Sequence, residues 1–247
     1  MNIVAFIPAR GQSKSIPNKN IKLLGDKPLV AWSIETAKKN KLRVIVNTED
    51  EDIANIAKFH GAEVMMRPKR LAGDKTSMFE VLQSEVFKID PIPDAVMILQ
   101  PTSPFRKNLY IQTAISYFTE NLDKYDSLIS VEKVLSKYSP YAMIIENHGK
   151  RMIFRKLIGL KEKLISWLTG IKFKHSLSGY PISQRMTRRQ DLPDCWLPDG
   201  SIYLFKTSNL KQGSIYGSST MLLQSEGTLN INDLDDFTKA EEICAQK

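Results

Sequence analysis

Cysteine and histidine are scarce in this chain. Only Cys195 and Cys244 occur among 247 residues, with no CxxC spacing, which excludes a disulfide-stapled fold and a cysteine-rich zinc site and indicates reduced thiols in a cytoplasmic protein. The three histidines, His60, His148 and His175, are scattered. No Ser–His–Asp or Cys–His arrangement and no zinc-ligand spacing can be assembled from them.

Long apolar runs are also missing. No stretch approaches the ~20 apolar residues that a membrane span needs, so we expect no stable membrane insertion. The apolar stretch from Asn2 to Pro8 is short and has no basic residues before it, so it does not resemble a signal peptide.

The positive charge is confined to one region. The net charge is +8, yet residues 151–189 contain ten Lys or Arg and only one acid, so this segment carries +9 and the remaining residues carry −1. A nucleic-acid-binding surface is therefore not indicated for the whole chain, and the basic segment needs a local explanation.

Strands and helices alternate through the first 135 residues. Apolar runs predict strands, and apolar residues three or four apart predict helices. The expected strands are Ile3–Ile7, Arg43–Val46, Glu63–Met66, Ala95–Leu99 and Ser127–Val131, and the expected helices are Pro28–Lys39, Asp50–Phe59, Ser77–Phe87 and Leu109–Phe118. This order predicts an α/β fold with a doubly wound, mostly parallel sheet, whose ligands bind beyond the carboxyl ends of the strands.

Residues 136–186 interrupt the alternation. They contain most of the net positive charge, and Phe154–Ile171 has the pattern of a basic amphipathic helix. After this segment, Gly200–Leu204 is expected to be a strand and Asp235–Ala245 a closing helix. We therefore predict a single domain over residues 1–247 with an insert at 136–186.

The turn after the first expected strand, Ile7–Asn20, has the composition of a triphosphate-binding loop. It combines a glycine, hydroxyl groups and three basic side chains within fourteen residues. Backbone N–H groups and Ser13 can donate to phosphate oxygens, and Arg10, Lys14 and Lys19 can neutralise their charge. The turn is neither G-x-x-x-x-G-K-[ST] nor G-x-G-x-x-G, so it is not an ordinary P-loop or dinucleotide-binding turn.

This turn resembles the signature loop of the acylneuraminate cytidylyltransferases, the CMP-sialic acid synthetase family. The family pattern is Ile-Pro-Ala-Arg-Gly-Gly-Ser-Lys-Gly-Ile-Pro-x-Lys-Asn. The chain departs from it at Gln12 and Ser15, where the family usually has glycine, which takes positive φ angles freely. Arg10, Ser13 and Lys19 stand where the family places them.

Further motifs follow in the family's order. Arg67–Asp74 resembles Arg-Pro-x-x-Leu-Ala-x-Asp, and Leu99–Arg106 resembles Leu-Gln-Pro-Thr-Ser-Pro-Leu-Arg. Arg188–Pro193 and Pro198–Tyr203 resemble Arg-Gln-x-Leu-Pro and Pro-Asn-Gly-Ala-Ile-Tyr. Four motifs in the right order make the resemblance specific over nearly the whole chain.

The resemblance implies a fold, a reaction and a set of site residues. The fold is a Rossmann-like nucleotidyltransferase domain, and the reaction transfers CMP from CTP to a nine-carbon sugar acid of N-acylneuraminate, legionaminate or pseudaminate type. The implied catalytic residues are Arg10 and Lys19. The implied nucleotide-binding residues are Ala9, Arg10, Gly11, Ser13, Lys14, Lys19, Asn20, Arg67 and Ser77, and the implied sugar-binding residues are Gln100, Thr102, Ser103, Arg189, Asp199 and Tyr203.

The resemblance also implies a homodimer, in which Arg189 grips the sugar carboxylate in the site of the other subunit. A planar guanidinium suits this role because it binds a carboxylate through two parallel bonds. The insert at 136–186 would then serve dimerisation and closure of the sugar site. Its basic helix has two interpretations: its charges steer anionic substrates, which we favour, or it lies on an anionic membrane.

The expected cofactor is Mg²⁺, and the chain departs from the family here. The family usually has Asp-Ile-Asp, whose aspartates bind the metal, where this chain has Asn230-Ile231-Asn232. Asn230 and Asn232 provide oxygen ligands without negative charge, and the neighbouring Asp233 is a further candidate ligand. Alternatively, Asp233, Asp235 and Asp236 simply cap the last helix.

Two other functions stay open. The asparagines favour a non-catalytic nucleotide-binding relative that has lost its metal site. The other alternative is a nucleotidyltransferase for another sugar acid, such as an eight-carbon one, although the Leu99–Arg106 and Arg188–Pro193 motifs argue against that substrate.

Overall fold

The computed structural model describes residues 1–134, 194–226 and 228–246. The chain divides into a unit of residues 133–197 and a larger unit, residues 1–132 with 198–247, which contains nearly all of the described strands and helices. Its strands are β1 (Ile3–Pro8), β2 (Leu23–Leu24), β3 (Lys27–Pro28), β4 (Arg43–Thr48), β5 (Glu63–Met66), β6 (Ala95–Ile98), β7 (Ser127–Lys133), β8 (Trp196–Lys206) and β9 (Thr220–Gln224). Its helices are α1 (Leu29–Lys39), α2 (Glu51–Phe59), α3 (Met78–Glu85), α4 (Asn108–Glu120) and α6 (Leu234–Ala245), with short 3-10 helices η1 (Lys19–Ile21), η2 (Lys69–Ala72), η3 (Val86–Lys88) and η7 (Thr207–Gln212).

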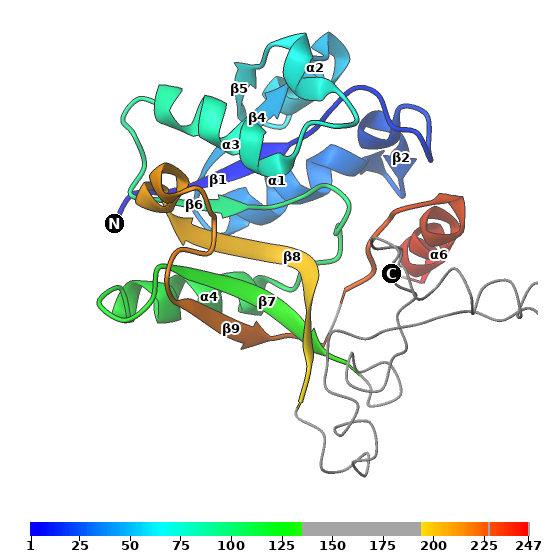
Figure 1. Cartoon of the computed structure of the whole chain (residues 1–247). Helices are drawn as coiled ribbons and strands as arrows, with labels where there is room; N and C mark the ends of the chain where they lie inside the picture. The colour runs from blue at the N-terminus through cyan, green and yellow to red at the C-terminus, as the bar shows by residue number, and fades with distance from the viewer. Residues whose placement is uncertain (135–193, 227, 247) are drawn as a thin grey trace, which may run out of the picture. The chain divides into compact units, whose positions relative to one another are not determined.

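A seven-stranded sheet in the order β5-β4-β1-β6-β8-β7-β9 forms the centre of the fold (Figure 1). β1 pairs in parallel with β4 and β6, β4 with β5, and β7 with β9, whereas β8 is antiparallel to β6. The expected doubly wound, mostly parallel sheet is therefore confirmed. The edge strand β9 was not predicted, because half-exposed residues in Thr220–Gln224 give it no buried apolar run.

The central strand β1 is buried on both faces. Ala5 and Ile7 pack in one cluster with apolar residues of α1, α2 and α4, while Val4 and Phe6 pack in a second cluster with residues of α3 and η7. Successive side chains of a strand point to opposite faces, so helices on both sides require the unbroken apolar run Ile3–Pro8.

All five expected helices begin and end within two residues of the expected bounds. The helix expected at Ser77–Phe87 is shorter, since α3 ends at Glu85 and the chain continues as the 3-10 helix η3. Ser77 itself is the N-cap: its hydroxyl accepts from the N–H of Glu80, and the Glu80 carboxylate accepts from the N–H of Ser77.

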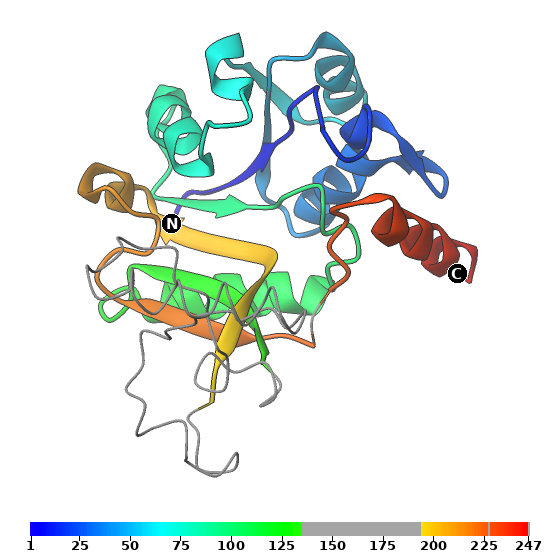
Figure 2. The ribbon, with the colours of Figure 1, turned by 45° about the vertical axis from the view of Figure 1, so that its right-hand side comes forward.

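The last helix, α6, packs against the start of the chain. Phe237 and Ala240 of α6 share a small apolar cluster with Ile16 and Leu24, and Ile231 lies in the same cluster. Figure 2 shows α6, in red, beside the blue hairpin of β2 and β3. This packing brings residues 230–236 to the turn that follows β1. Within the described part of the chain, no helix has the length and apolarity to cross a membrane.

Candidate active site

The turn after β1 is held by backbone and side-chain bonds at the carboxyl end of the sheet. The N–H of Ala9 donates to the carbonyl of Asn47 at 3.0 Å. Further along, the Asn20 amide donates to the Arg10 carbonyl at 2.7 Å and folds the turn back on itself. A Cβ on Gly11 would lie 2.3 Å from Oδ2 of Asp50, so no larger residue fits there without displacing Asp50.

Two segments meet the turn through charged bonds. The buried Arg67, which follows β5, binds Glu49, and Glu49 also accepts from the N–H of Gly11 at 2.8 Å. Beyond η2, Asp74 pairs with Lys14 and with Arg10, each at 3.0 Å. The hydrogen bond from Lys14 and the nearby Arg10 lower the pKa of the Asp74 carboxyl.

These segments surround a cavity of about 380 Å³. It lies where β1, β5 and β6 end, as expected for a parallel sheet of this kind. Seven of the predicted site residues line it, namely Arg10, Ser13, Lys19, Asn20, Arg67, Gln100 and Thr102. The structure thus brings together residues that three separate sequence motifs supplied.

Lys19 lines this cavity and is half-buried. Its ammonium donates to the carbonyl of Ile231 at 3.0 Å. Burial lowers its pKa, Arg10 lowers it further, and the carboxylate of Asp236 opposes both effects. The side chain is therefore anchored by one carbonyl, which leaves two N–H donors that can face an anion in the cavity.

Other predicted nucleotide-binding residues lie around the cavity without lining it. Ala9 and Gly11 belong to the turn itself, and Lys14 is mostly exposed in its pair with Asp74. Ser77 uses its hydroxyl in the N-cap of α3. A direct contact between Ser77 and a nucleotide stays a prediction.

The predicted sugar-binding residues divide into two groups. Gln100 and Thr102 line the cavity, whereas Ser103 and Asp199 are buried. The carboxylate of Asp199 accepts from the hydroxyls of Ser130 and Ser225 and from the N–H of Ser201 at 2.9 Å. These bonds occupy the Asp199 carboxylate, and Asp199 does not line the cavity.

Tyr203 and Arg189 complete the predicted sugar-binding set. Tyr203 packs against the cluster that contains Val4 and Phe6, and burial raises the pKa of its hydroxyl. Arg189 lies outside the described residues, as does the whole of the insert at 136–186.

The three predicted metal ligands lie between β9 and α6. Oδ1 of Asn230 accepts from the hydroxyl of Ser103, and its amide donates to the carbonyl of Asp199 at 2.6 Å. Asp233 caps α6, because its Oδ1 accepts from the N–H of Asp236 at 3.0 Å. Asn232 is exposed.

These contacts confirm the capping interpretation of Asp233. No cluster of three His, Cys, Asp or Glu side chains that would hold a metal occurs within the residues described. The exposed Asn232 and the second carboxylate oxygen of Asp233 are oxygen donors of the type that Mg²⁺ takes, usually one or two from the protein and the rest from phosphate and water.

Sequence reasoning missed three charged residues that shape the site. Glu49 directly follows β4, Asp74 ends the Arg67–Asp74 motif, and Arg106 ends the Leu99–Arg106 motif. The position of Glu49 was a usable signal, because polar residues directly after parallel strands face the ligand edge, and Asp74 and Arg106 stood within recognised motifs.

Arg106 is buried and has three neutral acceptors. It donates to the carbonyl of Ser201 at 2.6 Å, to the hydroxyl of Ser33 at 3.0 Å and to the carbonyl of Gln100. Burial lowers its pKa to about 9, and the Asp199 charge opposes this. Arg106 therefore fixes the backbone of Gln100, whose side chain lines the cavity.

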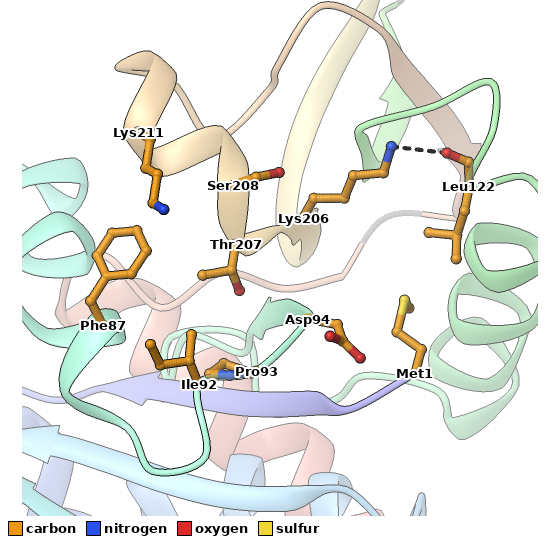
Figure 3. Close-up of a pocket in the computed structure, with 10 residues that line it drawn as sticks. All are labelled: Met1, Phe87, Ile92, Pro93, Asp94, Leu122, Lys206, Thr207, Ser208 and Lys211. Carbon is orange, nitrogen blue, oxygen red and sulfur yellow. Dashed lines mark hydrogen bonds between the residues drawn. The ribbon is translucent and has the colours of Figure 1, made fainter.

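A second cavity, of about 550 Å³, lies among other residues (Figure 3). Phe87, Ile92 and Leu122 contribute apolar walls, and Lys206 there donates to the Leu122 carbonyl at 2.9 Å. None of the predicted site residues lines this cavity.

The chain resembles known proteins along its length. The sequence model of the cytidylyltransferase family matches residues 4–147. An N-acylneuraminate cytidylyltransferase of Escherichia coli is 41% identical over 99% of this chain, but the chain spans only 52% of that protein. A post-translational flagellin modification protein B of Campylobacter coli is 28% identical, over 99% of this chain and 96% of its own length.

Other relatives extend the comparison. A CMP-N,N'-diacetyllegionaminic acid synthase of Legionella pneumophila is 40% identical over 47% of this chain and 52% of its own length. A solved CMP:2-keto-3-deoxy-manno-octonic acid synthetase in complex with CTP superposes with a TM-score of 0.67 at 16% identity, over 100% of this chain and 99% of that one.

The structural likeness supports the fold alone, whereas the sequence match covers more than half of the chain and includes the turn after β1 and the segments after β5 and β6. On this ground the chain belongs to the cytidylyltransferase family.

Proposed function

We propose that this chain transfers CMP from CTP to the anomeric hydroxyl of a nine-carbon, sialic-acid-like keto acid and releases pyrophosphate. The observation that carries the proposal is the cavity where β1, β5 and β6 end, which combines Arg10, Lys19 and Arg67 with the amide of Gln100. The names of the E. coli and L. pneumophila relatives support this substrate class. The chain spans about half the length of the E. coli relative, and the match to the L. pneumophila relative covers about half of each chain, so activities in the unmatched parts are not part of the proposal.

In this reaction the protein mainly positions groups and neutralises charge. The anomeric oxygen attacks the α-phosphorus in line, the bond to the β-phosphate bridging oxygen breaks, and pyrophosphate leaves while the hydroxyl loses its proton. Arg10, Lys14 and Lys19 would hold the triphosphate, and Ser13 would donate to a phosphate oxygen. Lys14 and Arg10 must then exchange Asp74 for phosphate, because Asp74 pairs with both.

Gln100 and Thr102 lie next to these cations and would contact the sugar acid. Asn20 would orient the nucleotide, since its amide is already fixed by the Arg10 carbonyl. Behind them, Ser103 and Asp199 hold Asn230 and the start of β8 in place. Such an arrangement favours reaction by fixing both reactants at attacking distance.

Assaying pyrophosphate release tests the proposal. The panel combines CTP, UTP, ATP and GTP with N-acetylneuraminate, legionaminate, pseudaminate and the eight-carbon 3-deoxy-manno-octulosonate. We expect release only with CTP and a nine-carbon acid. Preference for the eight-carbon acid would refute the substrate class. CTP binding by calorimetry without release from any acid would instead favour a non-catalytic relative.

We propose Mg²⁺ as the cofactor, held by Asn232 and the Asp233 carboxylate oxygen that does not cap α6, together with phosphate oxygens. Bound there, Mg²⁺ would neutralise charge on the triphosphate. Asn230 is a weaker candidate, because its oxygen already accepts from Ser103.

The two proposed ligands carry only one negative charge between them, which predicts weak metal binding. We expect activity to rise steeply with Mg²⁺ in the millimolar range and Asn232→Asp to lower the half-saturating concentration by about threefold to tenfold. Asn121→Asp, which adds the same charge beyond α4, is the control and should leave the titration unchanged. Full activity in EDTA would contradict any metal role.

We further propose that the chain acts as a homodimer, with Arg189 gripping the sugar carboxylate in the site of the other subunit and the insert at 136–186 forming the interface. Mixing two inactive chains tests this. A dimer of a Lys19→Ala chain and an Arg189→Ala chain contains one intact site, so mixing and reassociation should restore about a quarter of wild-type activity. No recovery from a mixture shown to form heterodimers would place Arg189 in its own subunit's site.

A further inference from the structure

Two arginine–carboxylate pairs join β4 to β5, one at each end of the strands. At the start, Arg43 of β4 binds Glu63 of β5 through two bonds of 2.7 Å each. At the end, Arg67 binds Glu49 through Nε at 2.9 Å and Nη2 at 2.8 Å. Only the second pair lies beside the cavity that contains Arg10 and Lys19.

Glu49 has a second contact that distinguishes it from Glu63. Its Oε1 accepts from the N–H of Gly11 at 2.8 Å, while its Oε2 binds Arg67. Gly11 belongs to the turn after β1, and Arg67 lines the cavity from the segment after β5. One carboxylate thus ties two separate parts of the cavity wall together.

We infer that Glu49 is a positioning residue for nucleotide binding, which sets the distance between the turn after β1 and the guanidinium of Arg67. The inference rests on the function proposed above and assigns Glu49 a role in binding CTP rather than in holding the sugar acid.

The burial of the pair explains why a charged acceptor is needed. Arg67 is only 7% exposed, so its charge requires a partner, and Asn47 offers it just one neutral acceptor at 3.5 Å. Without the carboxylate, the guanidinium would turn toward the cavity and the N–H of Gly11 would lose its acceptor.

Neighbouring contacts prevent the turn from compensating. Asp50, the next residue, caps α2 by accepting from the N–H of Ile53 at 3.0 Å. Its Oδ2 lies 2.3 Å from where a Cβ of Gly11 would be, so the turn passes directly over the Asp50 side chain. A displaced Gly11 would carry the adjacent Arg10 with it.

Glu49→Gln is the central test, because glutamine has nearly the same size but no charge. We expect the KM and the dissociation constant for CTP to rise about tenfold to a hundredfold, since charge-assisted bonds to two partners are weakened. The KM for the sugar acid and kcat at saturating CTP should stay within about twofold, because binding and not chemistry is affected.

Glu63→Gln is the matched control. It removes the same charge and the same type of arginine pair between the same two strands, at the end away from the cavity. CTP affinity should be unchanged in this variant. An equal loss in Glu63→Gln would show that Glu49 acts only through the stability of the sheet and would overturn the inference.

Glu49→Asp covers the case in which glutamine disturbs folding. Aspartate keeps a charge beside the buried Arg67, but it is one methylene too short to reach both partners. Its CTP affinity should lie between those of the wild type and Glu49→Gln. An unchanged affinity in both folded variants, or an equal rise in the KM for the sugar acid, would overturn the inference.

Calorimetry separates this inference from the proposed function. Wild-type protein that binds CTP without turnover would contradict the proposed function, yet a weaker affinity in Glu49→Gln would still support the role of Glu49. Wild-type protein that binds no CTP would refute both.

Discussion

Replacing Lys19 with alanine is expected to lower kcat/KM for CTP by about a thousandfold, the loss typical of removing one donor that stabilises developing charge. Lys19 lines the cavity and is half-buried beside Arg10, where water screens its charge less than on the open surface. Its one fixed bond, to the carbonyl of Ile231, leaves the rest of the ammonium to the triphosphate. Steady-state kinetics with varied CTP measures the effect.

The fold should survive this change. Losing the bond to Ile231 costs about 1 kcal/mol, which is small for a domain of this size. Lys22→Ala is the control, because Lys22 lies three residues further on, is exposed and contacts the ring of Phe237 rather than the cavity. Retained turnover in Lys19→Ala, together with a normal melting temperature, would reject Lys19 as a catalytic residue.

The sequence predicted the fold well because its central strands are buried on both faces. Unbroken apolar runs such as Ile3–Pro8 can be recognised without knowledge of their neighbours. The edge strand β9 could not be recognised in this way, since Thr220–Gln224 owes its strand conformation to pairing with β7.

The candidate site was predicted unevenly for a related reason. Motifs identified residues whose side chains face the cavity, such as Arg10 and Gln100. They did not reveal which side chains hold those residues in place, because Glu49 meets Gly11 only through contacts between segments 38 residues apart in the sequence. A motif also does not show which of its polar side chains line the cavity and which are buried in the protein. Gln100 and Arg106 differ in this way within one motif.

Arg106 illustrates this limit. It stands in the same motif as Gln100, and charge alone would assign it to a phosphate or a carboxylate. The structure buries it instead, between the Ser201 carbonyl of β8, the Ser33 hydroxyl of α1 and the Gln100 carbonyl after β6. A guanidinium can satisfy three such acceptors at once because its five donors are fixed in a plane.

Arg106→Met is therefore expected to destabilise the protein by about 3 kcal/mol, because it leaves two buried carbonyls and one hydroxyl without their donor. For a chain of this size the melting temperature should fall by about 6–12 °C. Thermal unfolding followed by circular dichroism measures the change.

Arg70→Met serves as the control, since Arg70 is exposed on η2 and its loss should leave the melting temperature nearly unchanged.

The kinetic consequence of Arg106→Met follows from the lost bond to the Gln100 carbonyl. Once the Gln100 carbonyl is released, its side chain is no longer held at the cavity, so the KM for the sugar acid should rise more than the KM for CTP. An Arg106→Met protein with wild-type stability and an intact KM for the sugar acid would show that Ser33 and water replace the guanidinium. A rise confined to the KM for CTP would instead make Arg106 a ligand for the triphosphate.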